Sequence, residues 1–162
     1  MKQLWAPWRI EYVLREKEKE CVFCKMQGEE KDRENSILYR GKTNFIVLNI
    51  YPYNNGHLMV IPYRHTSELT GITGEEMDEN GRLVQKSVEI LQERFKPHGF
   101  NIGMNVGSPA GAGIDEHIHM HVVPRWSGDT NFMPVVGEVR VLPQHIRETY
   151  DALIESFKGI VL

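Results

Sequence analysis

The sequence HIHMHVVP, residues 117–124, is the most informative stretch of the chain. Its histidines at 117, 119 and 121 alternate with apolar residues at 118, 120 and 122. Successive side chains of a β-strand point to opposite faces, so this alternation predicts a strand with three imidazoles on one face, about 7 Å apart, and an apolar face on the core. Polar groups gathered on one face mark a functional site more often than a packing role. His117, His119 and His121 are therefore the first candidate site residues.

The segments around this stretch predict a sheet with two helices. Strands are expected at 36–40, 44–49, 57–62, 100–106 and 117–124, and Asn55-Gly56 is a strong turn signal between the second and third of them. Thr73 and Glu76 form a capping box for a long helix over 75–96, and apolar residues at helical spacing predict a second helix over 143–158. This order indicates an α+β fold: a mostly antiparallel five-stranded sheet with one long helix and a C-terminal helix.

Length and composition narrow the class of protein. A chain of 162 residues suits one domain, and 41% hydrophobic with 25% charged residues is typical of a soluble globular protein. The net charge of −3 gives no overall attraction to nucleic acid or to an anionic membrane, so neither is expected as a partner. No stretch approaches the ~20 apolar residues of a membrane span, and the N-terminus lacks the apolar core of a signal peptide. A cytoplasmic location is expected.

We expect residues 1–162 to form a single domain with three parts. Residues 1–34 would be an exposed, charged leader, pinned at Cys21-Val-Phe-Cys24. Residues 36–126 would be the core that carries the histidines, and residues 127–162 an extension that ends in the second helix.

A glycine-rich loop, NVGSPAGAG at 105–113, leads into the histidine strand. Two chemistries fit the three histidines themselves. Alternating histidines can share a cation in a catalytic metal centre, and a neutral imidazole can attack phosphorus as a nucleophile. A glycine-rich loop can direct backbone N–H groups at phosphate oxygens, so its position before the histidines favours phosphate chemistry.

Together these stretches resemble the histidine-triad (HIT) superfamily, and within it the diadenosine tetraphosphate phosphorylase and fragile-histidine-triad-like branch. The resemblance implies a HIT-like fold and an enzyme that cleaves diadenosine tetraphosphate or triphosphate through a covalent nucleotidyl-histidine intermediate. It covers nearly the whole chain and rests on the histidine motif at 117–123 together with APWR at 6–9, FIVLN at 45–49, NNGHLMVIPYRH at 54–65, NVGSPAGAG at 105–113, HVVPRW at 121–126 and GDTNFMPV at 128–135.

The resemblance also implies roles for single residues. His119 would be the nucleophile, and the backbone carbonyl of His117 would hold its protonated ring nitrogen. His121 would contact the phosphate or protonate the leaving group, and His57 would support the triad. Asn49 would bind the ribose hydroxyls. The full set of expected nucleotide-binding residues is Asn49, Asn105, Ser108, Gly111, Ala112, Gly113, His121 and Trp126.

The glycine-rich loop departs from the family pattern near its end. Several phosphorylases of this branch carry a serine or threonine late in the loop, whereas this chain has Ala112-Gly113. The missing hydroxyl removes one donor that could hold inorganic phosphate. Phosphate and water therefore both remain possible acceptors of the nucleotidyl group.

The Cys21-x-x-Cys24 pair has three interpretations: a metal site, two free thiols or a redox pair. A thioredoxin-like redox pair should follow a strand and open a helix within a βαβ unit, and the charged leader has no such pattern. The resemblance implies that His65 and His117 complete a structural zinc site with the two cysteines. The need for magnesium stays open, because Asp115 and Glu116 precede the triad without forming a carboxylate cluster.

Partners and alternative functions follow from the remaining features. Two tryptophans in WAPWR at 5–9 predict packing across a homodimer interface, and assembly of that dimer into a tetramer is left open. Trp126 would reach the base or a partner subunit. The alternatives to dinucleotide cleavage are a nucleoside phosphoramidate hydrolase that uses the same nucleophile and a slow nucleotide-binding sensor.

Overall fold

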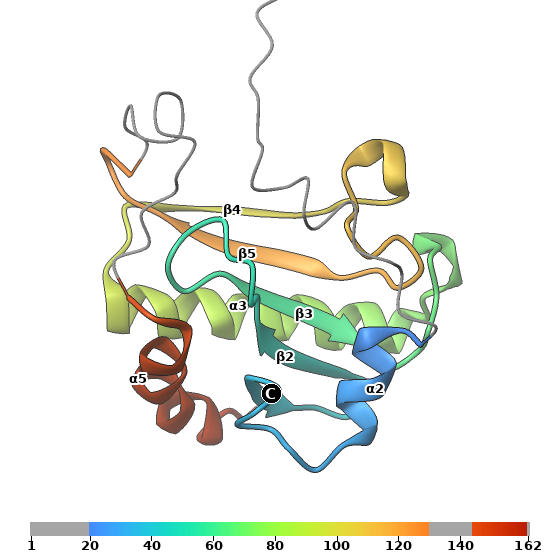
Figure 1. Ribbon diagram of the computed structural model, residues 1–162, viewed down its shortest axis with the longest axis horizontal. Helices are drawn as coiled ribbons and strands as arrows, with labels where there is room; N and C mark the ends of the chain where they lie inside the picture. Colours follow the sequence, from blue (N-terminus) through green and yellow to red (C-terminus); the bar gives the residue numbers. More distant parts are fainter. Residues whose placement is uncertain (1–19, 130–143, 162) are drawn as a thin grey trace, which may run out of the picture.

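A five-stranded antiparallel sheet forms the centre of the computed structural model, which describes residues 20–129 and 144–161. All neighbouring strands are antiparallel, as the sequence predicts. The order across the sheet is β1 (Ile37–Arg40), β2 (Asn44–Leu48), β3 (Leu58–Pro62), β5 (Met120–Arg125) and β4 (Gly99–Met104) (Figure 1). The α+β prediction is confirmed.

One face of the sheet is covered by α3 (Gly74–Phe95) and α5 (Ile146–Lys158) (Figure 1). The predicted capping box is present at the start of α3: the Thr73 hydroxyl accepts from the Glu76 N–H, and the Glu76 carboxylate accepts from the Thr73 N–H. Alternate residues of β2, β3 and β5 meet apolar residues of both helices. This main core contains Ile46, Leu48, Leu58, Val60, Leu83, Leu91, Val122, Leu153 and Phe157.

The opposite face carries a smaller core and a helix that the sequence did not predict. The helix is α2 (Val22–Gly28), which lies where an exposed leader was expected. Phe23 is its buried residue and packs with Cys21 and with the other faces of β2 and β3. The helix is seven residues long and its N-cap, Cys21, makes no side-chain capping bond, so no local sequence signal announces it.

The predicted strand over 117–124 is shorter than expected, because β5 begins at Met120. Continuing the β3–β5 register would place Pro62 opposite Ile118, and proline has no N–H to give to a ladder. The Ile118 N–H instead donates to the Thr66 carbonyl at 2.8 Å. His117 and His119 therefore lie in the segment just before β5, and His121 lies within it.

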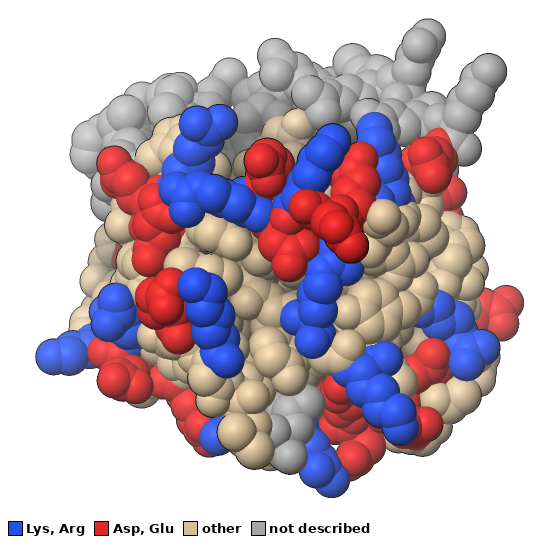
Figure 2. Space-filling view, turned by 90° about the horizontal axis from the view of Figure 1, so that it is seen from below, with Lys and Arg blue, Asp and Glu red and all other residues tan. Residues whose placement is uncertain are grey.

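The described surface has a mixed charge pattern and no membrane-spanning element. Figure 2 shows Lys and Arg side chains interspersed with Asp and Glu over the face seen from below. Within residues 20–129 and 144–161, none of the helices has both the length and the apolar character needed to cross a membrane.

Candidate functional site

The three triad histidines are buried together on the α2 side of the sheet. His117 is 0% exposed, His119 4% and His121 9%. The rings of His119 and His121 meet edge to face, with 4.7 Å between their centroids. Three imidazoles this deeply buried and this close cannot all be protonated at neutral pH without a large cost.

The ring of His119 is oriented by the backbone of His117. Nδ1 of His119 lies 2.9 Å from the His117 carbonyl oxygen. A carbonyl can only accept, so Nδ1 carries the proton and Nε2 keeps its lone pair. Burial lowers the pKa of His119 below its ordinary value, although the bond to His117 opposes the shift. The ring is thus a neutral imidazole with Nε2 available as a nucleophile.

A second chain of hydrogen bonds fixes the tautomer of His121. The backbone N–H of Tyr53 donates to Nδ1 of His57 at 3.0 Å, so His57 carries its proton on Nε2. Nε2 of His57 lies 2.9 Å from Nδ1 of His121, which must then accept. The proton of His121 is therefore on Nε2. Burial, with a smaller contribution from His119, lowers the pKa of His121 to about 4, so this ring is a neutral hydrogen-bond donor at pH 7.

Asn49 lies beside this chain of hydrogen bonds. Its Oδ1 accepts from the Tyr51 N–H at 2.9 Å, and its Nδ2 approaches Nδ1 of His57 at 3.3 Å. An amide has two N–H groups and two oxygen lone pairs, so each end of Asn49 retains capacity for a ligand. The predicted ribose-binding residue is therefore next to the histidine cluster.

The glycine-rich loop uses part of its backbone for its own fold. Its short 3-10 turn η2 (Ser108–Ala110) lies between Gly107 and Gly111, which both have positive φ angles, 84° and 90°. The N–H of Gly111 donates to the Ser108 carbonyl, and the N–H of Ala112 donates to that of Gly107 at 3.4 Å. Of the groups predicted to bind phosphate, the Ser108 side chain is exposed, whereas the Gly111 and Ala112 amides point into the loop. Asn105 is partly buried at the start of the loop, and Gly113 is exposed at its end.

Trp126 is not placed beside the triad. It follows the far end of β5, five residues beyond His121, which corresponds to roughly 16 Å along a strand. Its backbone N–H donates to the Asp129 carboxylate at 3.1 Å, and within the described residues no ring contact joins its side chain to a histidine. The WAPWR stretch and residues 130–135, which also carried the resemblance, lie outside the described residues.

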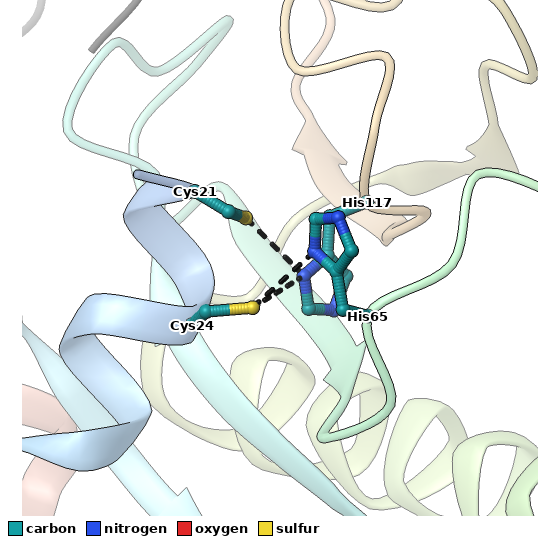
Figure 3. Close-up of side chains that lie close together, drawn as sticks. All are labelled: Cys21, Cys24, His65 and His117. Carbon is teal, nitrogen blue, oxygen red and sulfur yellow. Dashed lines mark hydrogen bonds between the residues drawn. The ribbon is translucent and has the colours of Figure 1, made fainter. Parts of the chain in front are cut away.

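Four predicted metal ligands converge on one point (Figure 3). The ligand atoms of Cys21, Cys24, His65 and His117 all lie within 4.8 Å of one another. Nδ1 of His117 is 3.4 Å from the Cys21 sulfur, and Nδ1 of His65 is 3.3 Å from the Cys24 sulfur. Among the described residues, these four form the group of His, Cys, Asp and Glu side chains that lie close enough together to hold a cation. Asp115 and Glu116 do not belong to it.

The chemistry of this cluster fits zinc. Two thiols and two imidazoles form a tetrahedral zinc ligand set. Nε2 of His117 donates to the Pro62 carbonyl at 2.9 Å, which leaves the lone pair of Nδ1 directed at the sulfurs. Burial raises the pKa of the Cys21 thiol to about 11, so a cation would have to displace its proton to bind.

Two aromatic residues that the sequence did not single out complete the site. Phe23 packs edge-on against His117 and His119, with centroid distances of 5.4 and 5.2 Å. Tyr53 stacks on His57 at 4.8 Å. Phe23 lies between the two cysteines in sequence, which was the available signal, whereas nothing local to Tyr53 predicts its contact.

The comparisons with known proteins agree with this fold and this site. The HIT domain model matches residues 30–128, and this chain therefore belongs to the HIT family. A protein of Mycobacterium tuberculosis H37Rv named AP-4-A phosphorylase is 40% identical over 157 residues, which cover 92% of this chain and 80% of that protein. A bis(5'-nucleosyl)-tetraphosphatase (asymmetrical) of Schizosaccharomyces pombe is 30% identical over 95 residues, 59% of this chain and 52% of the relative.

A solved structure shares the fold. The Zn-bound histidine triad family protein from Mycobacterium smegmatis superimposes with a TM-score of 0.69 at 29% identity, over 86% of this chain and 94% of that one.

Proposed function

We propose that this protein is a nucleotidyl transferase or hydrolase that cleaves diadenosine tetraphosphate or triphosphate through a covalent nucleotidyl-His119 intermediate. The observation that carries the proposal is the bond from Nδ1 of His119 to the His117 carbonyl, which leaves Nε2 free to attack phosphorus. The substrate class is supported by relatives named for the phosphorolysis of AP-4-A and for tetraphosphate hydrolysis.

The first step breaks one P–O bond and forms one P–N bond. Nε2 of His119 attacks the phosphorus next to one adenosine, and diadenosine tetraphosphate then releases ATP. The nucleotidyl-histidine ring carries a positive charge, which the bond to the His117 carbonyl stabilises.

His121 assists by contact rather than by giving up its proton. Its Nε2–H, fixed by His57, can donate a hydrogen bond to a phosphate oxygen as charge develops there. The leaving group is itself a phosphate oxygen, which is stable as an anion. The neutral ring of His121 carries one N–H proton, and loss of that proton would leave an imidazolate, which is a strong base. Of the two roles expected for His121, the phosphate contact is therefore favoured.

The second step transfers the adenylate from His119 to an acceptor. Inorganic phosphate would give ADP, and water would give AMP. The name of the mycobacterial relative favours phosphate, and the exposed Ser108 offers a hydroxyl in the loop that lacks one at Ala112-Gly113.

A product assay with diadenosine tetraphosphate, with and without inorganic phosphate, tests this proposal. ATP with phosphate-dependent ADP identifies a phosphorylase, and ATP with AMP identifies a hydrolase. Absence of turnover under both conditions would contradict the substrate proposal, and turnover of a nucleoside phosphoramidate in its place would favour the alternative hydrolase.

We also propose that Cys21, Cys24, His65 and His117 hold a structural zinc ion. The convergence of the four ligand atoms supports it, as does the solved structure described as Zn-bound. The ion would connect α2 to the loop after β3 and to the segment before β5, and would thereby stiffen the His117 backbone that orients His119.

A homodimer is proposed for the complete protein. Support comes from β4, which forms an edge of the described sheet and exposes Ile102, at 49%, with Val106 beyond its end at 45%. Sedimentation of the purified protein tests this assembly, because a monomer at micromolar concentration would contradict it and a tetramer would extend it.

A further inference from the structure

The two ends of helix α2 lack the capping interactions that would stabilise it. It spans seven residues, its N-cap residue makes no side-chain capping bond, and Glu29 after it is extended rather than left-handed. Isolated helices of this length are not stable in water, and the carbonyls of the last turn need partners from elsewhere.

Arg40, at the end of β1, supplies those partners. Its Nη1 donates to the Gln27 carbonyl at 2.8 Å, and its Nη2 donates to the carbonyls of Met26 at 3.3 Å and Glu29 at 2.8 Å. The other side of the guanidinium binds Asp32, with Nε and Nη2 both donating to Oδ1 at 3.0 and 2.8 Å. The positive charge at the C-terminus of α2 also has the favourable sign for the helix dipole.

The helix that Arg40 holds carries half of the metal ligands. The sulfur atoms of Cys21 and Cys24 come from its N-terminal end, and Phe23 from its buried face. The imidazole half is fixed separately, since His117 donates to the Pro62 carbonyl and belongs to the segment before β5. The distance between the thiols and the imidazoles therefore depends on how α2 sits on the sheet.

A second contact between α2 and the sheet is weaker. The Gln27 side chain donates a single bond to the Tyr63 carbonyl at 3.1 Å, at the end of β3. Arg40 makes two bonds to carbonyls of the helix and one to that of Glu29 directly after it, and adds an ion pair with Asp32. Charge-assisted hydrogen bonds are the stronger kind, so Arg40 dominates the polar attachment of α2.

We propose that Arg40 is a positioning residue for the metal site: its guanidinium fixes α2 on the sheet and so keeps Cys21 and Cys24 within reach of the His65 and His117 ligands. The proposal rests on the proposed zinc site. A lysine at position 40 would place a positive charge near the same carbonyls but would lack the planar fork that reaches three of them and Asp32 at once.

Zinc release gives the first test. Purified zinc-loaded protein is mixed with a chromogenic chelator, and release is followed for wild type, Arg40→Met, Arg40→Lys and Arg33→Met. Arg33 is the matched control, because its side chain pairs with Asp151 of α5 and, within the described residues, makes no hydrogen bond or ion pair with α2. Arg40→Met should release zinc about ten-fold faster or more, Arg40→Lys should fall between it and wild type, and Arg33→Met should stay within about two-fold of wild type. Equal release from Arg40→Met and Arg33→Met would overturn the proposal.

Amide hydrogen exchange gives a readout that needs no metal. In metal-free protein, the amides of α2, such as that of Lys25 bonded to the Cys21 carbonyl, should exchange at least about ten-fold faster in Arg40→Met, while β2 and β3 keep their protection. Unchanged α2 exchange, or the same acceleration in every strand, would overturn the positioning role. A wild-type protein that takes up no zinc would instead contradict the zinc proposal alone.

Asp32→Asn provides a second variant if Arg40→Met does not fold. It weakens the ion pair that holds the guanidinium and leaves Arg40 itself present. Faster α2 exchange in the same direction, but smaller than about ten-fold, supports the proposal. Exchange identical to wild type would contradict it.

Discussion

The backbone carbonyl of His117 accepts a hydrogen bond from Nδ1 of His119, and the side chain of the same His117 lies 3.4 Å from the Cys21 sulfur. One residue thus belongs to the candidate metal site through its ring and orients the candidate nucleophile through its main chain. Phe23, held on α2, touches both rings. If the metal site becomes disordered, the orientation of the His119 ring is therefore expected to be disturbed as well.

Removing the nucleophile should abolish turnover without unfolding the protein. We expect His119→Ala to lower kcat on diadenosine tetraphosphate by about 10⁴-fold or more, because no other neutral Nε2 occupies its position. His98→Ala is the matched control, since His98 is exposed and bonds to Ser127 away from the triad. Comparable activity in the two variants would rule out His119 as the nucleophile.

The hydrogen bond from His57 to His121 should contribute to the rate. His57→Phe keeps a ring that can stack on Tyr53 but removes the donor that fixes the His121 tautomer. We expect kcat to fall by about 10- to 100-fold with a smaller change in KM, as measured by steady-state kinetics. A wild-type kcat in this variant would mean that the tautomer of His121 does not need His57.

Zinc binding should release protons and grow tighter as pH rises. Burial raises the pKa of Cys21 to about 11, so the thiol is protonated at neutral pH until a cation displaces the proton. Calorimetric titration of the metal-free protein with zinc in buffers of different ionisation enthalpy measures this release. Metal removal should also lower Tm, and a stoichiometry below one zinc per chain in the intact protein would count against the site.

Acid should destabilise the fold partly through His121. Its pKa falls from 6.5 to about 4 on folding, so the folded state holds the proton less readily than the unfolded chain. The stabilisation is fully present above pH 6.5 and is lost as pH falls from 6.5 through about 4, with an upper limit of about 3 kcal/mol. The free energy of unfolding at pH 7.5 and pH 4.5, for wild type and His121→Asn, measures it. The variant should lose less on acidification, and equal losses would contradict the assignment.

The parts of the fold that local sequence could predict are those with local causes. Thr73 and Glu76 meet across one helical turn, and β2 and β3 alternate or run apolar within a few residues, so both were predicted. The late start of the histidine strand, at Met120, depends on Pro62, which is distant in sequence, and was missed.

The residues of the candidate site also fall into two groups, those that local sequence indicates and those that it does not. The spacing and residue types of the histidines and cysteines indicate a site, and the ligand atoms of four of them lie close together in the structure. Phe23 lies between the two cysteines, but its ring contacts are with histidines 94 and 96 residues away. Tyr53 stacks on His57 across a loop, and Arg40 binds groups 8 to 14 residues away, and no local pattern indicates these contacts. Trp126 was expected to reach the base or a partner subunit; it follows the end of β5 that is far from His121, and its role stays a prediction.

The covalent mechanism can be tested by looking directly for the adenylate on His119. Wild-type protein is mixed with diadenosine tetraphosphate without inorganic phosphate, quenched with alkali within milliseconds to seconds, and analysed as intact protein and as peptides by mass spectrometry. We expect one adenylate per chain, attached to His119 and absent from His119→Ala. Turnover with no adduct on any time scale, or an adduct on a different residue, would contradict this expectation.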